Sequence, residues 1–219
     1  MLPIRISLEN NSPYTSAFTA CSFMYSEFNA VLPLLKSENS GVLLKEEIAN
    51  RNYIKVNNEV SAKRIVTEFI RRYSAVPHDF WDWYDSMDEP AQRAALLYVI
   101  IKTYRLIFEF HVNVSIKKWN SVDHTISIHD LQLELLDISA NDEFVDSWSE
   151  QTKKKLMSAY LTILRQAEML DSKTNELRPL RLQPNEFKYY VECGDLWFLD
   201  ACLLTPMEKE NVINAYKNF

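Results

Sequence analysis

Glycine is almost missing from this 219-residue chain, which holds only Gly41 and Gly194. Phosphate-binding loops, dinucleotide-binding folds and β-sandwiches need glycine where the backbone approaches a phosphate or takes a positive φ. The motifs HExxH, CxxC and GxSxG are also missing, and no paired-carboxylate pattern surrounds the four histidines. These absences favour a helical protein that is not an enzyme and needs no cofactor.

Long apolar runs and a disulfide pattern are missing too. The longest uncharged stretch of the most apolar segment covers residues 94–101, far short of the roughly 20 residues that cross a bilayer. The start, MLPIRISLEN, has no apolar signal core, and the three cysteines are an odd number without metal-ligand spacing. We therefore expect a cytoplasmic protein with no membrane partner.

The composition is rich enough in apolar residues to build a core, at 47% hydrophobic and 12% aromatic. The net charge of −6 is unevenly distributed. Residues 1–76 hold 9 Lys and Arg against 7 Asp and Glu, residues 77–150 hold 5 against 14, and residues 151–219 hold 10 against 9. Either end of the chain can therefore present a basic face, whereas the middle cannot.

We predict three contiguous units, covering residues 1–76, 77–150 and 151–219. In the first, apolar residues recur at spacings of three and four from Glu59 to about Ser74, which predicts an amphipathic helix. Lys63, Arg64 and Arg71 fall on its opposite side, with Arg72 at the edge. An apolar-rich segment near Tyr14 to Leu35 and a short predicted helix at about residues 42–49 precede this helix. Three helices in about 60 residues, the last of them basic, suit a helix-turn-helix that binds DNA. The alternative is an ordinary solvated helix face.

The second unit is acidic. Its opening, PHDFWDWYDSMDEP, predicts either a helix whose aromatic side chains enter the core or an aromatic and acidic docking surface for another protein. A long helix is predicted from about Glu89 to His111, apolar on almost every side and so buried by several neighbours. The later stretch HDLQLELLDIS predicts another amphipathic helix.

The third unit combines a basic helix with a basic hairpin. Ser147 and Glu150 have the spacing of a capping box, which predicts a helix that continues to about Met169. Its apolar face leaves a polar stripe mostly facing outward: Gln151, Lys154, Lys155, Ser158, Thr162 and Arg165. Polar residues 171–175 and the alternating LRPLRL that follows predict a hairpin, so the order is that of a winged helix. Residues 153–181 contain seven basic residues and only three acids. The seven that could contact phosphates are Lys153, Lys154, Lys155, Arg165, Lys173, Arg178 and Arg181.

The segment DHTISIHD is the one place that suggests a metal site. Its two histidines are five residues apart and so share no helix face, and its acids have the positions of helix caps. We expect no metal. The predicted fold is thus mainly all-α: a helical bundle core with a helix-turn-helix-like first unit and a winged-helix-like last unit.

The succession of these segments resembles the BrxA family of bacterial BREX phage-defence systems over roughly residues 14–190. The resemblance rests on YTSAFTACSFMYSEFNAVLPLL, VNNEVSAKRIVTEFIRRY, KTYRLIFEFHV and WSEQTKKKLMSAYLTILRQAEML. Ser61, Lys63, Arg64 and Arg72 match the first polar and basic pattern of the family, and Trp148 and Thr152 open the later one. The sequence QAEML departs from the family, in which a glycine is expected near the helix end.

The resemblance implies a helical protein without enzymatic activity that is encoded beside a methyltransferase, a large ATPase and a phosphatase-like protein and acts in phage exclusion. It also implies a distant likeness to the NusB antitermination fold. Two functions stay open: a subunit that binds duplex DNA through its basic end units, or an adaptor that organises the other BREX proteins. RNA binding, suggested by the NusB likeness, is a variant of the first.

Overall fold

The computed structural model describes residues 11–216, and within these residues regular structure is helical. Two isolated antiparallel bridges join Leu170 to Leu177 and Thr125 to Glu176. The segments are η1 (Ala17–Ala20), α1 (Tyr25–Lys36), α2 (Ser40–Asn50), α3 (Glu59–Tyr73), α4 (His78–Asp85), α5 (Glu89–Thr103), α6 (Arg105–Phe110), η2 (His111–Ile116), α7 (Lys117–Trp119), α8 (Ile128–Asn141), α9 (Glu143–Asp146), α10 (Glu150–Gln166), η3 (Pro184–Phe187), α11 (Lys188–Glu192), α12 (Trp197–Ala201) and α13 (Pro206–Tyr216). The prediction of an all-α protein is confirmed.

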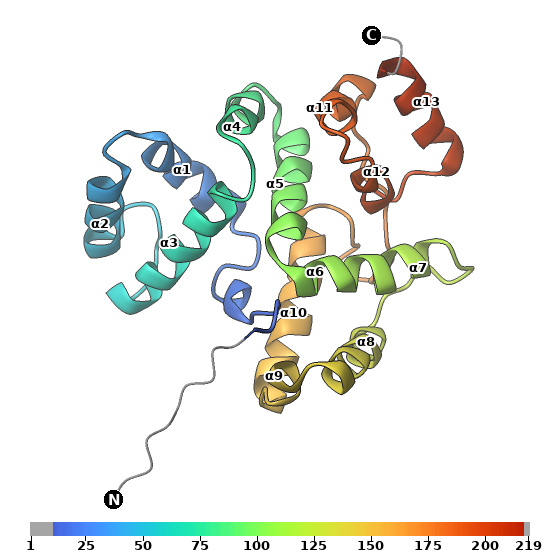
Figure 1. Ribbon diagram of the computed structural model, residues 1–219, viewed down its shortest axis with the longest axis horizontal. Helices are drawn as coiled ribbons and strands as arrows, with labels where there is room; N and C mark the ends of the chain where they lie inside the picture. Colours follow the sequence, from blue (N-terminus) through green and yellow to red (C-terminus); the bar gives the residue numbers. More distant parts are fainter. Residues whose placement is uncertain (1–10, 217–219) are drawn as a thin grey trace, which may run out of the picture.

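Helices from the two ends of the chain lie on opposite sides of a central group (Figure 1). The first three helices, α1 to α3, form one side, and α11 to α13 form the other. Between them stand α5 and α10, with α6 and α7 crossing below and α8 and α9 beyond. The buried apolar residues of all these parts form one connected core. The three predicted units therefore pack against one another, and their boundaries stay a prediction.

The predicted basic helix is present as α3. Its apolar residues Ala62, Ile65, Val66 and Phe69 are buried. Asn58 caps the start of the helix, because its side-chain oxygen accepts from the amide of Ser61 at 2.8 Å. Sequence periodicity was sufficient to locate this helix and its buried side.

The prediction of one helix from Glu89 to His111 is wrong. The chain bends at Tyr104, whose φ of −121° and ψ of 109° are extended, and α5 and α6 run in different directions (Figure 1). No glycine or proline marks this position. The bend is instead held by tertiary contacts: the Tyr104 hydroxyl donates to buried Glu68 at 2.8 Å, and its ring lies 5.4 Å from that of Phe18.

The aromatic and acidic segment at residues 79–89 belongs to the fold. Phe80, Trp81 and Tyr84 are fully buried. Asp82 and Asp85 are exposed and both pair with Lys36 of α1, at 2.6 and 2.8 Å. The interpretation with the aromatic side chains in the core is confirmed.

The third unit begins and ends differently from the prediction. Ser149, two residues beyond the expected Ser147, caps α10 by accepting from the amide of Thr152 at 3.2 Å. The hairpin is reduced to the bridge between Leu170 and Leu177, and Leu180 already bonds to the carbonyl of Cys202 instead. The helix-turn-helix and winged-helix descriptions therefore stay predictions.

The end of α10 shows why a glycine was expected there. The amide of Glu168 bonds to the carbonyl of Arg165, and that of Met169 to Leu164, which is the hydrogen-bond pattern of a Schellman motif. Glu168 occupies its left-handed position with φ of 63°. A side chain with a Cβ is strained in this region, where glycine is not.

Replacing Glu168 with glycine should therefore raise the free energy of unfolding by about 0.5–1 kcal/mol, the relief of strain being partly offset by a more flexible unfolded chain. Urea unfolding of both proteins measures the difference. Gln166→Gly, inside the last turn of α10, is the control and should lose about 1 kcal/mol. A loss of stability in Glu168→Gly would contradict the expectation.

Candidate nucleic-acid interface

A polar stripe runs along the exposed side of α10. Lys154, Lys155 and Ser158 are exposed, and Gln151 and Thr162 continue the stripe. Beneath it, Leu156, Tyr160, Ile163 and Leu164 are fully buried, so packing fixes the rotation of the helix about its axis. The predicted outward direction of the stripe is confirmed.

The outer side of α3 presents a second basic surface. Lys63, Arg64, Thr67 and Arg71 are all exposed, as the helical periodicity predicted. Arg71 pairs with the carboxylate of Glu68 at 3.2 Å, which offsets part of its charge. Lys63 and Arg64 have no ion pair among the described residues, so their charges remain available to a ligand.

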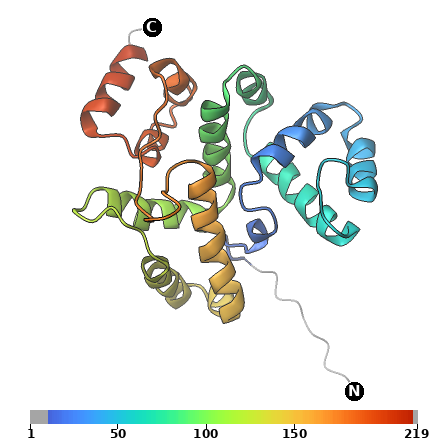
Figure 2. The same ribbon diagram turned by 180° about the vertical axis from the view of Figure 1, so that it is seen from behind.

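The short helix η1 lies between these two surfaces and packs against both α3 and α10. Figure 2 shows η1, in blue, beside α10, in orange, with α3, in teal, on its other side. Thr19 of η1 lines two neighbouring hollows: one shared with Lys63 and Arg64, the other with Lys154 and Lys155. We call the surface formed by Thr19, Lys63, Arg64, Lys154 and Lys155 the η1 surface. It joins basic residues that are about 90 positions apart in the sequence.

The prediction that Arg72 contacts phosphate is wrong. Its side chain is fully buried, because it donates to the backbone carbonyls of Cys21, Ser22 and Phe23 at 3.2, 2.5 and 2.9 Å. These carbonyls directly follow η1. Arg72 therefore fixes the η1 segment against α3 and supports the η1 surface from below without reaching a ligand.

Buried polar groups continue beneath the η1 surface. Glu68 is 3% exposed and accepts hydrogen bonds from Tyr104 and Arg71. Burial raises the pKa of the Tyr104 phenol, so its proton remains available for this bond. The side chains of Glu68, Arg72 and Tyr104 make their hydrogen bonds to other groups of the protein and not to a ligand. We therefore assign them the role of holding η1 and α3 in place beneath the η1 surface.

Lys153 differs from its two neighbours on α10. Its side chain is only 15% exposed and faces Glu150 at 3.6 Å and Asp146 at 4.0 Å. Its charge is offset by these acids, so we leave it outside the η1 surface.

The other predicted residues lie at the far end of α10. Lys173, Arg178 and Arg181 are exposed around the turn that follows the helix, and Arg165 donates to the side chain of Asn175 at 2.8 Å. Backbone amides of Thr174 and Lys173 lower the pKa of Asp171 to about 2, and this carboxylate pairs with Arg178. The end of α10 is about 16 Å from Lys154, given about 1.5 Å per residue over the 11 residues to Arg165. The structure therefore divides the predicted C-terminal cluster into two groups.

Thr19 is the member of the η1 surface that the sequence did not indicate. The segment from Tyr14 to Leu35 reads as one apolar-rich stretch, within which Phe18, Cys21 and Phe23 are indeed buried. Exposed Thr19 and Ala20 lie between buried Phe18 and Cys21, at the end of a helix of only four residues. Such a short helix has too few residues for its periodicity to be recognised.

The segment DHTISIHD is occupied by helix caps. Asp130 and Ser127 form a reciprocal capping box at the start of α8, and Asp123 accepts from the amide of Thr125 at 2.9 Å. Among residues 11–216 no group of three or more His, Cys, Asp or Glu side chains is placed to hold a metal ion. In the same residues no helix is both long and apolar enough to cross a membrane.

Comparison with known proteins agrees with this arrangement of helices. The BrxA family model matches residues 12–192. The chain belongs to the BrxA family. The match includes η1, α3 and α10, so every residue of the η1 surface lies within the region shared with the BrxA family.

Two relatives extend the comparison. The BREX protein BrxA of Bacillus cereus (strain H3081.97) is 26% identical over 190 residues, which cover 85% of this chain and 94% of that protein. An uncharacterized protein from Magnetospirillum magneticum has a crystal structure similar in fold, with a TM-score of 0.68 at 19% identity, covering 88% of this chain and 98% of that one. This BrxA-family chain thus matches both relatives over nearly their whole length.

Proposed function

We propose that this BrxA-family chain is a non-enzymatic component of a BREX system and that it binds duplex DNA through the η1 surface. The observation that carries the proposal is the convergence of Lys63 and Arg64 with Lys154 and Lys155 on the two sides of η1. Membership of the BrxA family and the similarity to a BREX protein support the system to which it belongs. Other BREX proteins are accordingly its expected protein partners.

The residue types favour contact with phosphates over reading of bases. Lysines are flexible point charges that neutralise phosphates and release counterions, whereas base recognition depends on bidentate Arg, Asn or Gln side chains fixed in a groove. Three of the four basic residues of the η1 surface are lysines. Binding should therefore have little sequence preference.

The polar stripe of α10 offers a path for a longer duplex. Residues 11 positions apart on an α-helix lie nearly on the same side, so Arg165 follows Lys154 along one edge. Arg165, Lys173, Arg178 and Arg181 then provide additional phosphate contacts at the far end. Arg71 extends the contact on α3, weakened by its pairing with Glu68.

The test is a salt titration of binding to one sequence as duplex DNA, single-stranded DNA and RNA. Lys154→Glu with Lys155→Glu should abolish measurable duplex binding near physiological salt and reduce the log–log salt slope by about two units, roughly 0.9 per lost contact. Lys63→Glu with Arg64→Glu should have the same effect, because both pairs belong to one surface. All four residues are exposed, so the variants should fold.

The matched control is Lys117→Glu with Lys188→Glu, which makes the same change in net charge on exposed residues of α7 and α11. It should retain most of the affinity. An equal loss of duplex affinity in the control variant would mean that net charge alone drives binding. Preference for RNA would favour the NusB-like alternative, and no binding of any nucleic acid at low salt would favour the adaptor.

A further inference from the structure

The apolar side of helix α8 is only partly buried against the rest of the protein. Leu131, Leu135 and Ile138 are buried, with at most 6% exposure. Ile128, Leu133 and Leu136 are exposed at 48%, 50% and 55%. At 3.6 residues per turn the six side chains span an arc of about 220°, in which Gln132 and His129 are also found. An apolar stripe of about 100° is enough to pack a helix on a core, so half of this arc lacks a partner.

Part of the uncovered side forms a hollow against α10. Ile128, Leu135 and Leu136 line it from α8, and Met157 lines it from α10. Its volume is about 100 Å³, whereas pockets for small molecules measure about 300–1,000 Å³. The hollow therefore has the size for a single side chain presented by a larger partner.

The lining of this hollow also contains an unsatisfied polar group. The hydroxyl oxygen of Ser139 is buried and has no hydrogen-bond partner among the described residues. A buried hydroxyl without a partner costs free energy, which a docked polar group would recover. Gln132 and Glu150 lie at the edge of the same hollow.

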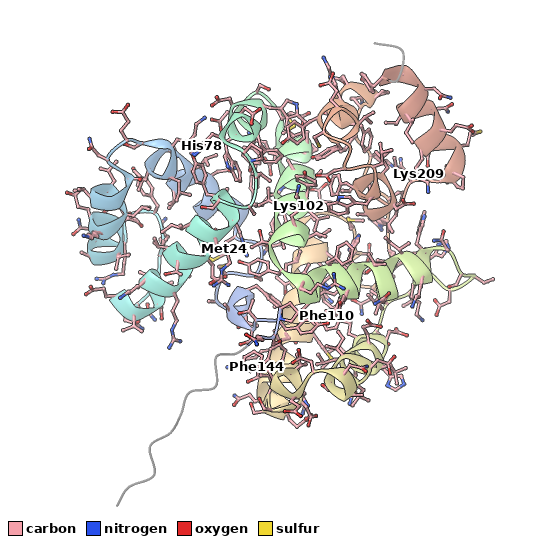
Figure 3. The ribbon with its side chains drawn as sticks, viewed as in Figure 1. Met24, His78, Lys102, Phe110, Phe144 and Lys209 are labelled. Atoms are coloured by element: carbon pink, nitrogen blue, oxygen red, sulfur yellow. The ribbon has the colours of Figure 1, made fainter. Side chains whose placement is uncertain are left out.

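The apolar surface continues onto α9, which packs against α8. Phe144 is 37% exposed, and its ring meets that of Trp148 edge to face at 5.5 Å. Figure 3 labels Phe144 on the side of the molecule away from α11 to α13. We call Ile128, Leu133, Leu136 and Phe144 the α8 strip.

The segment that carries the α8 strip has charged residues of one sign. Residues 128–150 contain seven Asp and Glu and no Lys or Arg. Asp137 and Glu143 are exposed and have no ion pair among the described residues. Asp146 and Glu150 share Lys153, and Lys154 lines the hollow from α10. The border of the strip along α8 and α9 therefore keeps a negative charge, and the positive charge lies on its α10 side.

We propose that the α8 strip docks a basic amphipathic helix of a partner protein. Apolar anchors of such a helix fill the strip and the hollow beside Met157, as in other helix-in-groove complexes, while its Lys and Arg face the acidic border. The proposal is independent of the proposed duplex binding. The two sites are neighbours, however, because Lys154 lines both this hollow and the η1 surface.

The test uses three labelled synthetic helices and the full chain, with binding measured by fluorescence anisotropy. The first has leucines at positions i, i+3, i+4 and i+7 with lysines elsewhere, the second is a scramble of the first, and the third has glutamate for lysine. The first should bind at least tenfold more tightly than the others. Leu136→Asp, and separately Leu133→Asp, should each weaken it about tenfold, which corresponds to about 1.4 kcal/mol.

The matched control is Val42→Asp on α2, where an aliphatic residue is 59% exposed outside the strip. It should leave peptide binding unchanged. Equal binding of the scrambled peptide, or unchanged binding by both leucine variants, would overturn the proposal. A dimer that sedimentation shows to depend on Leu136 would replace the partner with a second copy. Because Leu136→Asp should retain duplex affinity, failure here is distinguishable from failure of the proposed function.

Discussion

Replacing Arg72 with methionine should lower the free energy of unfolding by about 3–5 kcal/mol, the range measured when one partner of a buried charged network is removed. Methionine fills much of the volume but donates no hydrogen bond. Three carbonyls then lose their donor: those of buried Cys21 and Phe23 and that of half-buried Ser22. Each unsatisfied buried group costs about 1–3 kcal/mol, reduced where the segment moves into water.

The control for this prediction is Arg64→Met, which makes the same substitution on the exposed side of the same helix and should change stability by no more than about 0.5 kcal/mol. Arg72→Lys should lie between the two, because lysine keeps the charge but lacks the planar fork that reaches three carbonyls. Urea unfolding measures all three. Equal stability of the Arg72 and Arg64 variants would refute the role assigned to Arg72.

A second readout locates the effect. Loss of Arg72 should release η1 from α3, so amide hydrogen exchange should accelerate at residues 17–24 before other parts of the core. Because Thr19 lies between the two basic pairs, duplex binding should weaken in Arg72→Met although Arg72 contacts no ligand. Unchanged exchange in this segment would place the loss of stability elsewhere.

Acidification should destabilise the protein through His111, by about 2 kcal/mol between pH 7.5 and pH 5. This histidine is fully buried, and burial lowers its pKa from 6.5 to about 4. Its Nε2 donates to the carbonyl of Ala201 at 2.8 Å, so Nδ1 must accept from the hydroxyl of Tyr160 at 3.0 Å. That hydroxyl in turn accepts from Ser115 at 2.6 Å. The neutral imidazole makes both hydrogen bonds. A protonated Nδ1 could no longer accept from Tyr160, so the imidazolium would lose that hydrogen bond.

The direction of the pH effect follows from the lowered pKa. Between pH 6.5 and pH 4 the unfolded chain binds a proton at His111 that the folded chain does not. Stability is therefore complete above pH 6.5 and falls as the pH decreases toward 4. The sign is opposite to that of a histidine stabilised by a carboxylate.

The matched variant is His111→Gln, whose amide can make the same two hydrogen bonds but does not titrate. Urea unfolding at pH 7.5 and pH 5 should show a smaller pH-dependent loss in the variant, by about 2 kcal/mol. Carboxylates common to both proteins contribute equally and cancel in this comparison. Equal losses in the two proteins would show that His111 titrates normally.

Much of the helical structure could be predicted from local patterns. The spacing of Ile65, Val66 and Phe69 fixed the buried side of α3 and placed Lys63 and Arg64 outside. The same logic gave the polar stripe of α10 and the amphipathic character of α8. These predictions succeeded because helix periodicity depends on neighbours three and four residues away.

The bend at Tyr104 and the burial of Arg72 could not be predicted in this way. Tyr104 lies in a stretch of helix-forming residues without glycine or proline, and the bend is held by Glu68 and Phe18, which are more than 30 residues away. Arg72 lies at the edge of the basic face of α3. A rotation of the helix by a few tens of degrees about its axis would move this side chain from solvent into the core. The side chain is buried because the backbone carbonyls of residues 21–23 accept its hydrogen bonds. These residues are about 50 positions away, so the local sequence around Arg72 does not indicate the contact.

The sequence by itself determined the helical class, the resemblance to the BrxA family, and the sides of α3 and α10 on which the basic residues lie. Only the tertiary structure decided that those two sides meet at η1, that Lys153 and Arg72 do not belong to the surface, and that α8 keeps an uncovered apolar side. The physical reason is range. Periodicity and capping act within one or two turns of a helix, whereas a surface is made by segments that long-range packing brings together.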